Sequence, residues 1–179
     1  MAARRAQLRR RRLHTSLAEA LNGAGWLASA RDHIHARSLF ERSLALRREQ
    51  GDEQSVAGLL LNLGSVAGAL GEYDQEVALC EQSLSLYQAL GDRRAAASAL
   101  GNLALALEHS DPERAESLYT ESLALFEEVG DHRGAAITLT NLGWSALLKG
   151  GHAQAEVHCK AALRIYGELR NQEGIAYLP

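Results

Sequence analysis

Apolar residues recur at three- and four-residue spacing along most of the chain, in segments separated by glycine and polar breaks. Leu60, Leu63 and Ala67 fall on one side of a helix in this spacing, with Gly64 beside them. The same stripe recurs at Leu100, Leu103, Ala104 and Leu107, and at Leu139, Leu142, Gly143 and Ala146. This periodicity predicts amphipathic helices that bury one face.

Breaks in the pattern predict that the helices come in pairs. The segments "GEYD", "SDPE" and "GGHA", which begin at residues 71, 110 and 150, each end one helix and start the next. The second helix of a pair then ends at a Gly-Asp dipeptide, because Gly accepts the left-handed conformation after a helix and Asp caps the following one. These dipeptides are Gly51-Asp52, Gly91-Asp92 and Gly130-Asp131.

The helix pairs form an internal repeat. One asparagine recurs in the first helix of each copy, at Asn22, Asn62, Asn102 and Asn141, with spacings of 40, 40 and 39 residues. The second helices share the segments "LFERSLAL", "LCEQSLSL", "LYTESLAL" and "HCKAALRI". Four copies follow, at about residues 17–56, 57–96, 97–135 and 136–176, within a predicted repeat domain of residues 14–179.

The repeated segments resemble the tetratricopeptide repeat family, in its longer form of about 40 residues per unit. The resemblance implies an all-α, right-handed α-solenoid of four helix hairpins, with a truncated fifth first helix in "NQEGIAYLP" and a concave surface lined by first helices. Phe40 and Tyr119 match the family's aromatic position, and Cys80 and Cys159 replace it as small core residues. The small residues at the first helix crossing are predicted to be Ala24, Gly64, Ala104 and Gly143.

Two departures from the family pattern need a structural answer. Glu76 stands where the other copies have alanine, so its helix is shifted or rotated, or its carboxylate reaches solvent or an arginine. The third copy is one residue shorter near Ser110, which predicts a tighter turn. The end at "NQEGIAYLP" predicts either a longer protein or a terminal face that another chain covers, including self-association through this end.

Composition and charge narrow the class of protein. Apolar residues make up 46% of the chain and charged residues 23%, as in globular proteins. Residues 1–13 form a basic arm with six arginines, whereas the rest carries 13 basic and 22 acidic side chains. This acidic body disfavours nucleic acid as a partner. No segment has the length or hydropathy of a membrane span or a secretory signal, so we expect a cytoplasmic protein.

The repeated asparagine points away from the apolar stripe, since Asn62 lies about 200° from Leu60 and about 100° from Leu63 around the helix. The resemblance implies that this side faces the groove, where an asparagine contacts the backbone of a bound peptide. Four such residues would form a ladder for a peptide of roughly ten or more residues. The alternative is that each asparagine bonds to a neighbouring backbone or stabilises the stacking of first helices.

The groove lining predicted with this ladder is small and apolar. It comprises Gly25, Ser65, Leu105 and Trp144 one turn after each asparagine, and Ala18, Gly58, Ser98 and Ile137 one turn before. Trp144 is either the ligand anchor or is packed against the next repeat. No basic residue occurs in this lining, which argues against a carboxylate clamp, although Arg93, Arg94 and Arg133 begin the first helices.

Two functions remain open. The first is a protein-interaction module that holds an extended or helical peptide segment in its groove. The second is a regulatory, sensor or self-assembly segment of a larger bacterial signalling or transcription-regulator protein. No residues stand at the spacing of a catalytic set, a phosphate-binding loop or a metal site, so we expect neither an enzyme nor a cofactor.

Overall fold

The computed structural model describes the backbone of residues 2–170 and 172–179, and the side chains of residues 12–170 and 173–179. Its described residues are helical apart from short connections. In chain order the helices are α1 (Ala2–Ser29), α2 (His33–Gln50), α3 (Glu53–Ala69), α4 (Tyr73–Leu90), α5 (Arg93–Leu107), α6 (Pro112–Glu128), α7 (His132–Leu148), α8 (His152–Glu168) and α9 (Gln172–Ala176). They fall into two compact units, α1–α4 and α5–α9.

The helix boundaries confirm the predicted role of the Gly-Asp dipeptides. Each aspartate caps the following helix by accepting a hydrogen bond from the backbone N–H three residues on, over 3.0–3.1 Å. Each glycine before it has a φ near +70°, which a residue without a Cβ adopts readily. Asp111 caps α6 in the same way, with Pro112 in its first turn.

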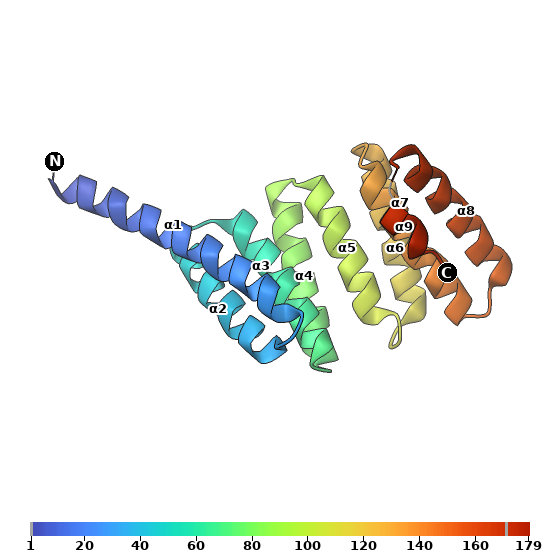
Figure 1. The fold of residues 1–179 in the computed structure, drawn as a ribbon, viewed down its shortest axis with the longest axis horizontal. Helices are drawn as coiled ribbons and strands as arrows, with labels where there is room; N and C mark the ends of the chain where they lie inside the picture. Colours follow the sequence, from blue (N-terminus) through green and yellow to red (C-terminus); the bar gives the residue numbers. More distant parts are fainter. Residues whose placement is uncertain (1, 171) are drawn as a thin grey trace. The chain divides into compact units, whose positions relative to one another are not determined.

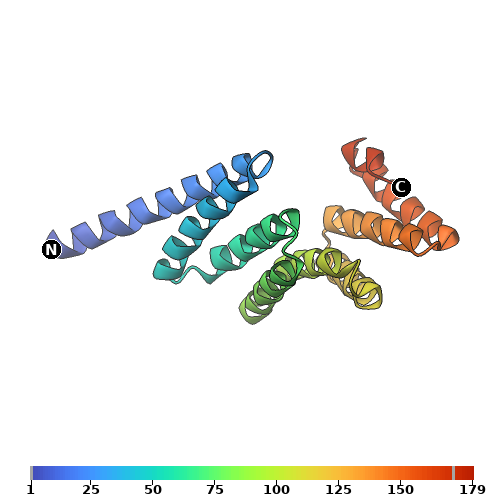
Figure 2. The same ribbon diagram turned by 90° about the horizontal axis from the view of Figure 1, so that it is seen from below.

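In the unit α1–α4, antiparallel pairs α1/α2 and α3/α4 are joined by packing of α2 against α3 (Figure 1). Phe40, Leu60 and Leu63 lie in their common core. Figure 2 shows that α1 extends beyond the end of α2. This extension contains the predicted basic arm, and the side chains of Arg4, Arg5, Arg9, Arg10 and Arg11 are outside the described residues.

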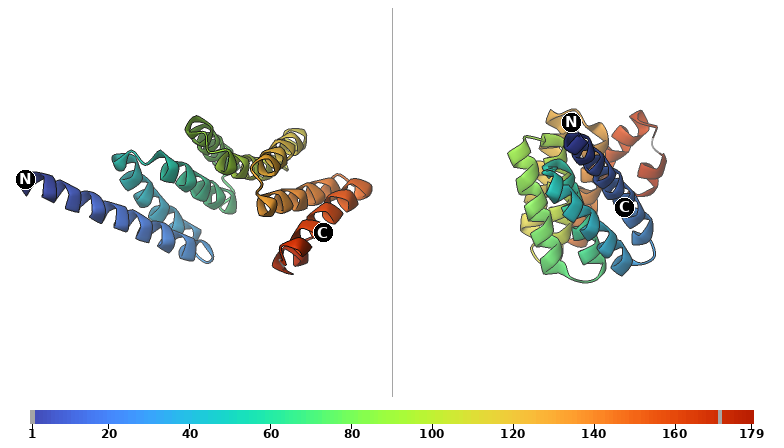
Figure 3. Two further views of the ribbon diagram at one scale, coloured as in Figure 1. Left: turned by 90° about the horizontal axis from the view of Figure 1, so that it is seen from above. Right: turned by 90° about the vertical axis from the view of Figure 1, so that its left-hand side faces the viewer.

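In the unit α5–α9, the pairs α5/α6 and α7/α8 are joined by packing of α6 against α7, and the short α9 packs on α8 (Figure 3). A Cβ on Gly134 would collide with the Phe126 ring. Forty residues further along the chain, a Cβ on Gly174 would collide with the Tyr166 ring in the same way. This repeated contact places α9 as the start of a fifth first helix. The predicted truncated fifth helix is therefore confirmed.

A buried serine fixes how the two helices of a pair cross. Ser43, Ser83 and Ser122 each donate a 2.8 Å hydrogen bond from Oγ to a first-helix carbonyl, and each is fully buried. The acceptors are the carbonyls of Ala18, Ala57 and Ala97. In the fourth pair the fully buried Ala162 takes the place of the serine.

This contact corrects the register predicted for the first copy. Ser43 lies 25 residues after its acceptor and Ser83 lies 26 after its own, so the first copy is one residue shorter than the second. Gly25, whose missing Cβ leaves room for the Phe40 ring, therefore occupies the crossing. The prediction of Ala24 at this crossing was wrong, and Ala24 is exposed. The predicted short turn of the third copy is confirmed, since α5 already ends at Leu107.

Glu76 lies half-buried at the crossing of α3 and α4. Its carboxylate occupies the space where a Cβ of Gly68 would be, and burial raises the pKa of this carboxyl group. Among the ion pairs of the described side chains, none involves Glu76. The carboxylate is thus accommodated by a glycine rather than by an arginine.

Cys80 is a small core residue, as the sequence predicts, whereas Cys159 is only partly buried. Cys80 is 2% exposed and lies against Gly64, and burial raises the pKa of its thiol to about 12. Cys159 lies against Gly143 in the corresponding place. Within the described residues neither cysteine forms a disulfide. None of the helices described here combines the length and apolar character that crossing a membrane requires.

Candidate functional site

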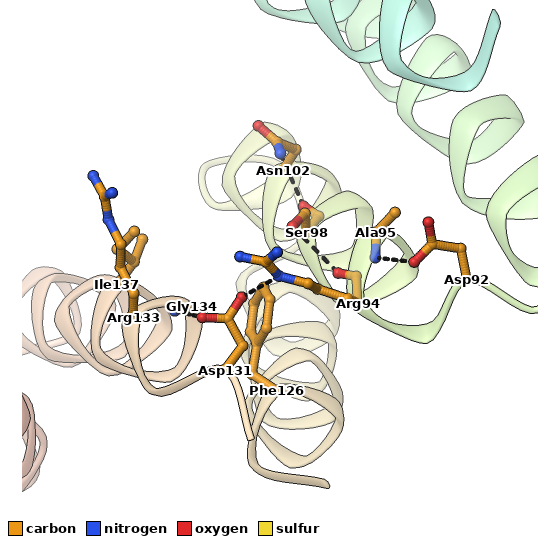
Figure 4. Close-up of a pocket in the computed structure, with 10 residues that line it drawn as sticks. All are labelled: Asp92, Arg94, Ala95, Ser98, Asn102, Phe126, Asp131, Arg133, Gly134 and Ile137. Atoms are coloured by element: carbon orange, nitrogen blue, oxygen red, sulfur yellow. Dashed lines mark hydrogen bonds and ion pairs between the residues drawn. The ribbon is translucent and has the colours of Figure 1, made fainter. Parts of the chain in front are cut away.

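The first helices α5 and α7 border a cleft of about 630 Å³ (Figure 4). α5 contributes Arg94, Ser98 and Asn102 from its outward side, and α7 contributes Arg133 and Ile137. The remaining lining residues are Asp92, Ala95, Phe126, Asp131 and Gly134. The volume lies in the range of pockets that bind side chains and small ligands.

One arginine of this cleft is paired and the other is not. Arg94 Nε donates to Asp131 Oδ2 over 2.5 Å. Burial opposes ionisation of Asp131, but the hydrogen bond from the Gly134 N–H and the pairing with Arg94 outweigh it and lower the pKa of Asp131. Arg133 is exposed and its guanidinium extends away from Asp131 in Figure 4. The described residues supply no hydrogen-bond or ion-pair partner for the Arg133 side chain.

A second cleft of about 310 Å³ lies between α7, the end of α8 and α9. Its aromatic lining includes Trp144, whose Nε1–H donates to the Tyr177 carbonyl over 3.2 Å. Thr140 and Tyr166 bring their hydroxyl oxygens within 3.3 Å of each other at its wall. Arg133, Ile137, Asn141, Glu173 and Gly174 complete the lining.

Helix α7 separates these two clefts and presents one row of side chains to them. Arg133, Ile137, Asn141 and Trp144 follow each other at spacings of four, four and three residues, so they lie on one side of the helix. Arg133 and Ile137 line both clefts, and Ile137 and Trp144 are each 47% exposed. From Arg133 to Trp144 the row rises roughly 16 Å along the helix axis. We call these four residues the α7 row.

The four repeated asparagines differ in their contacts. In the unit α1–α4, Asn62 Nδ2 donates to Asn22 Oδ1 over 3.1 Å, and both residues line a cleft of about 380 Å³. In the other unit, Asn102 Nδ2 donates to the Ser98 carbonyl over 2.8 Å. The Asn141 amide makes no hydrogen bond to the part of the chain that the structure describes. Both alternatives to ligand contact, stacking of first helices and local backbone bonding, therefore occur in the chain.

The exposure of the other predicted lining residues differs between the copies of the repeat. Leu105 is 52% exposed and Ser65 is also exposed. The predicted first-copy residues Gly25 and Ala18 are buried instead, because that copy is one residue short. Trp26, which is 57% exposed, takes the place predicted for Gly25. The spacing of the asparagines gives no signal for this shift, because Asn22 keeps the same 40-residue spacing to Asn62 that Asn62 has to Asn102.

The charged part of the lining was predicted only in part, since Arg94 and Arg133 were named as starts of first helices and not as lining residues. The predicted lining was small and apolar, whereas Arg94, Asp131 and Arg133 border the larger cleft. Glu173 and Tyr177 border the smaller one. The available signal was the run of charged residues that begins each first helix, read together with the repeat spacing.

The comparison with family models identifies the repeat. A model described as Tetratricopeptide repeat matches residues 55–128 and 110–168. The chain belongs to the tetratricopeptide repeat family. The first tetratricopeptide repeat, α1/α2, precedes the matched residues, and it is assigned here by the Ser43 contact that it shares with the next two repeats.

Solved structures show the same kind of fold. The crystal structure of BtubC (BKLC) from P. vanneervenii aligns with a TM-score of 0.74 and 22% identity over 88% of this chain and 66% of that chain. The apo form of RapI aligns with a TM-score of 0.78 and 15% identity over 88% of this chain and 58% of that chain. The chain thus spans about two thirds of BtubC and somewhat over half of RapI. A comparison with curated proteins found no match. The predicted α-solenoid class is confirmed.

Proposed function

We propose that this tetratricopeptide repeat chain is a protein-interaction module that holds a segment of a partner protein along the α7 row. The observation that carries the proposal is that Arg133 and Ile137 border both clefts and Asn141 borders the smaller one, while the side chains of Arg133 and Asn141 have no hydrogen-bond or ion-pair partner among the described residues. Trp144 adds an exposed aromatic surface at the end of the row. An exposed row of this kind, with an aromatic anchor beside polar groups, suits peptide recognition.

Asn141 is the best placed of the four asparagines for this task. Its amide offers two donors and one acceptor, which match the N–H and C=O groups of a peptide backbone whatever the side chains are. Asn102 would contribute once it exchanges its hydrogen bond to the Ser98 carbonyl for one to the bound peptide. Asn22 and Asn62 would have to give up their mutual hydrogen bond, so we assign them a larger share in holding α1 to α3.

A cross-linking experiment tests this proposal. A photoreactive amino acid replaces Ile137 on the α7 row or, as a matched control, Val157, which is 65% exposed on α8 and lines none of the clefts described above. We expect partner segments to become linked from position 137 and not from position 157.

The other outcomes separate the alternatives. Equal linking from both positions would remove the α7 row as the binding surface. Links to a second copy of the chain would favour self-association. Links to further domains of a longer protein that contains this chain would favour the regulatory or sensor function.

A further inference from the structure

The α7 row contains one uncompensated cation. Arg133 borders both clefts, yet neither wall supplies it with an acidic partner. On the α5 side, Asp131 is held by Arg94 and by the Gly134 N–H. Asp92 caps α5 through the Ala95 N–H (Figure 4). The carboxylates of the larger cleft are therefore committed to other groups.

The far wall of the smaller cleft has the opposite charge. Glu173 is exposed there and forms no ion pair with Arg133. An acidic side chain of a ligand would be repelled on this wall and attracted at Arg133, on the side of the larger cleft. Charge complementarity of this kind fixes the orientation and register of a bound segment.

The apolar part of the α7 row sets a distance from this charge. Ile137 lies one helical turn beyond Arg133 and Trp144 lies three turns beyond it. The rise from Arg133 to Trp144 equals the length of about five residues of an extended chain at roughly 3.3 Å each. An extended segment can therefore present one side chain to Arg133 and another to Trp144.

We propose that the α7 row selects an extended partner segment in which an Asp or Glu pairs with Arg133 and an aliphatic or aromatic side chain, about five residues away, packs on Trp144. This inference rests on the proposed function and adds the chemistry of the partner. The acidic side chain contributes specificity and steering, while the apolar side chain contributes most of the buried area.

Binding of defined peptide pools to the full chain tests the inference. Each fluorescent pool has an invariant Leu and, about five residues before it, an invariant Asp, Lys or Ser, with random small polar residues elsewhere. Binding is measured by fluorescence anisotropy. The variant is Arg133→Glu, and Arg42→Glu is the matched control because Arg42 is exposed on α2 and lines none of the clefts.

We expect the Asp pool to bind about tenfold more tightly than the Lys pool at low salt. Arg133→Glu should reverse this preference and Arg42→Glu should leave it intact. Equal binding of all three pools, or a preference that survives Arg133→Glu, would overturn the inference while leaving the proposed function standing. Failure of every pool to bind, at any salt concentration, would also overturn the inference, and the cross-linking from position 137 decides separately whether the proposed function stands.

Discussion

The carboxylate of Glu76 offers the sharpest test of how this repeat accommodates a charge at a helix crossing. Full burial of an unpaired ion costs several kcal/mol. Glu76 is half-buried and keeps part of its water, so we expect Glu76→Gln, which preserves size and removes the charge, to stabilise the chain by about 1 kcal/mol at neutral pH.

The pH dependence of this gain follows from the direction of the pKa shift. Burial raises the pKa of Glu76 in the folded chain above its usual value of 4.5. At a pH between 4.5 and this folded-state pKa, the folded chain therefore holds a proton that the unfolded chain has released. The wild type therefore loses stability relative to Glu76→Gln as the pH rises from 4.5 through the folded-state pKa. Below pH 4.5 the difference disappears, because the carboxyl group is protonated in both states.

A second variant tests the geometry independently of the charge. A Cβ on Gly68 would displace the Glu76 carboxylate, which is the flexible end of a long side chain and can move out to water. We therefore expect Gly68→Ala to return the pKa of Glu76 towards its usual value. The variant should also gain up to about 1 kcal/mol from helix propensity.

Urea denaturation followed by circular dichroism, from mildly acidic to mildly alkaline pH, measures both effects. A gain of 1 kcal/mol corresponds to a shift in the urea midpoint of roughly 0.5 M. A difference between wild type and Glu76→Gln that stays constant with pH would refute the reasoning, since a constant difference cannot come from a titrating carboxyl group.

Two further predictions concern the packing of the helix pairs. Gly134→Ala should cost about 1–3 kcal/mol of stability, because its Cβ collides with the Phe126 ring. Gly167→Ala, whose Cβ meets nothing within 4 Å, should be neutral or stabilising. Thermal unfolding midpoints that fall equally in the two variants would contradict this. Ser83→Ala should cost about 1 kcal/mol of stability through loss of its 2.8 Å hydrogen bond to a carbonyl of α3. Ser85 is exposed, so Ser85→Ala should change the urea midpoint little. Equal effects of the two variants would show that this hydrogen bond does not determine the crossing.

The fold was predictable from the sequence because the residues that end one helix and start the next act locally. A glycine with positive φ and an aspartate that caps the next helix act within a few residues, and Gly91-Asp92 shows both effects as predicted. The register of the first copy was not predictable from Asn22, because a turn that is one residue shorter moves the asparagine relative to the crossing. Only a contact between helices, such as Ser43 with Ala18, reports that shift.

The candidate site was less accessible from the sequence. Asn141 and Trp144 were found from the repeat. The charge of the clefts, however, depends on which carboxylates are already paired with other groups of the chain. Arg94 and Asp131 are 37 residues apart, and nothing in the local pattern indicates that they pair and leave Arg133 free. The mutual bond of Asn22 and Asn62 is likewise a contact between helices in different repeats.

The α7 row is tested most directly by nuclear magnetic resonance of the chain during titration with the partner segment recovered from the Ile137 cross-link. The side-chain amide of Asn141 and the indole N–H of Trp144 each report on one position of the row. We predict that both signals shift in proportion to the bound fraction while the backbone signal of Val157 on α8 stays in place. Shifts at Val157 with unchanged signals of Asn141 and Trp144 would contradict binding along the α7 row.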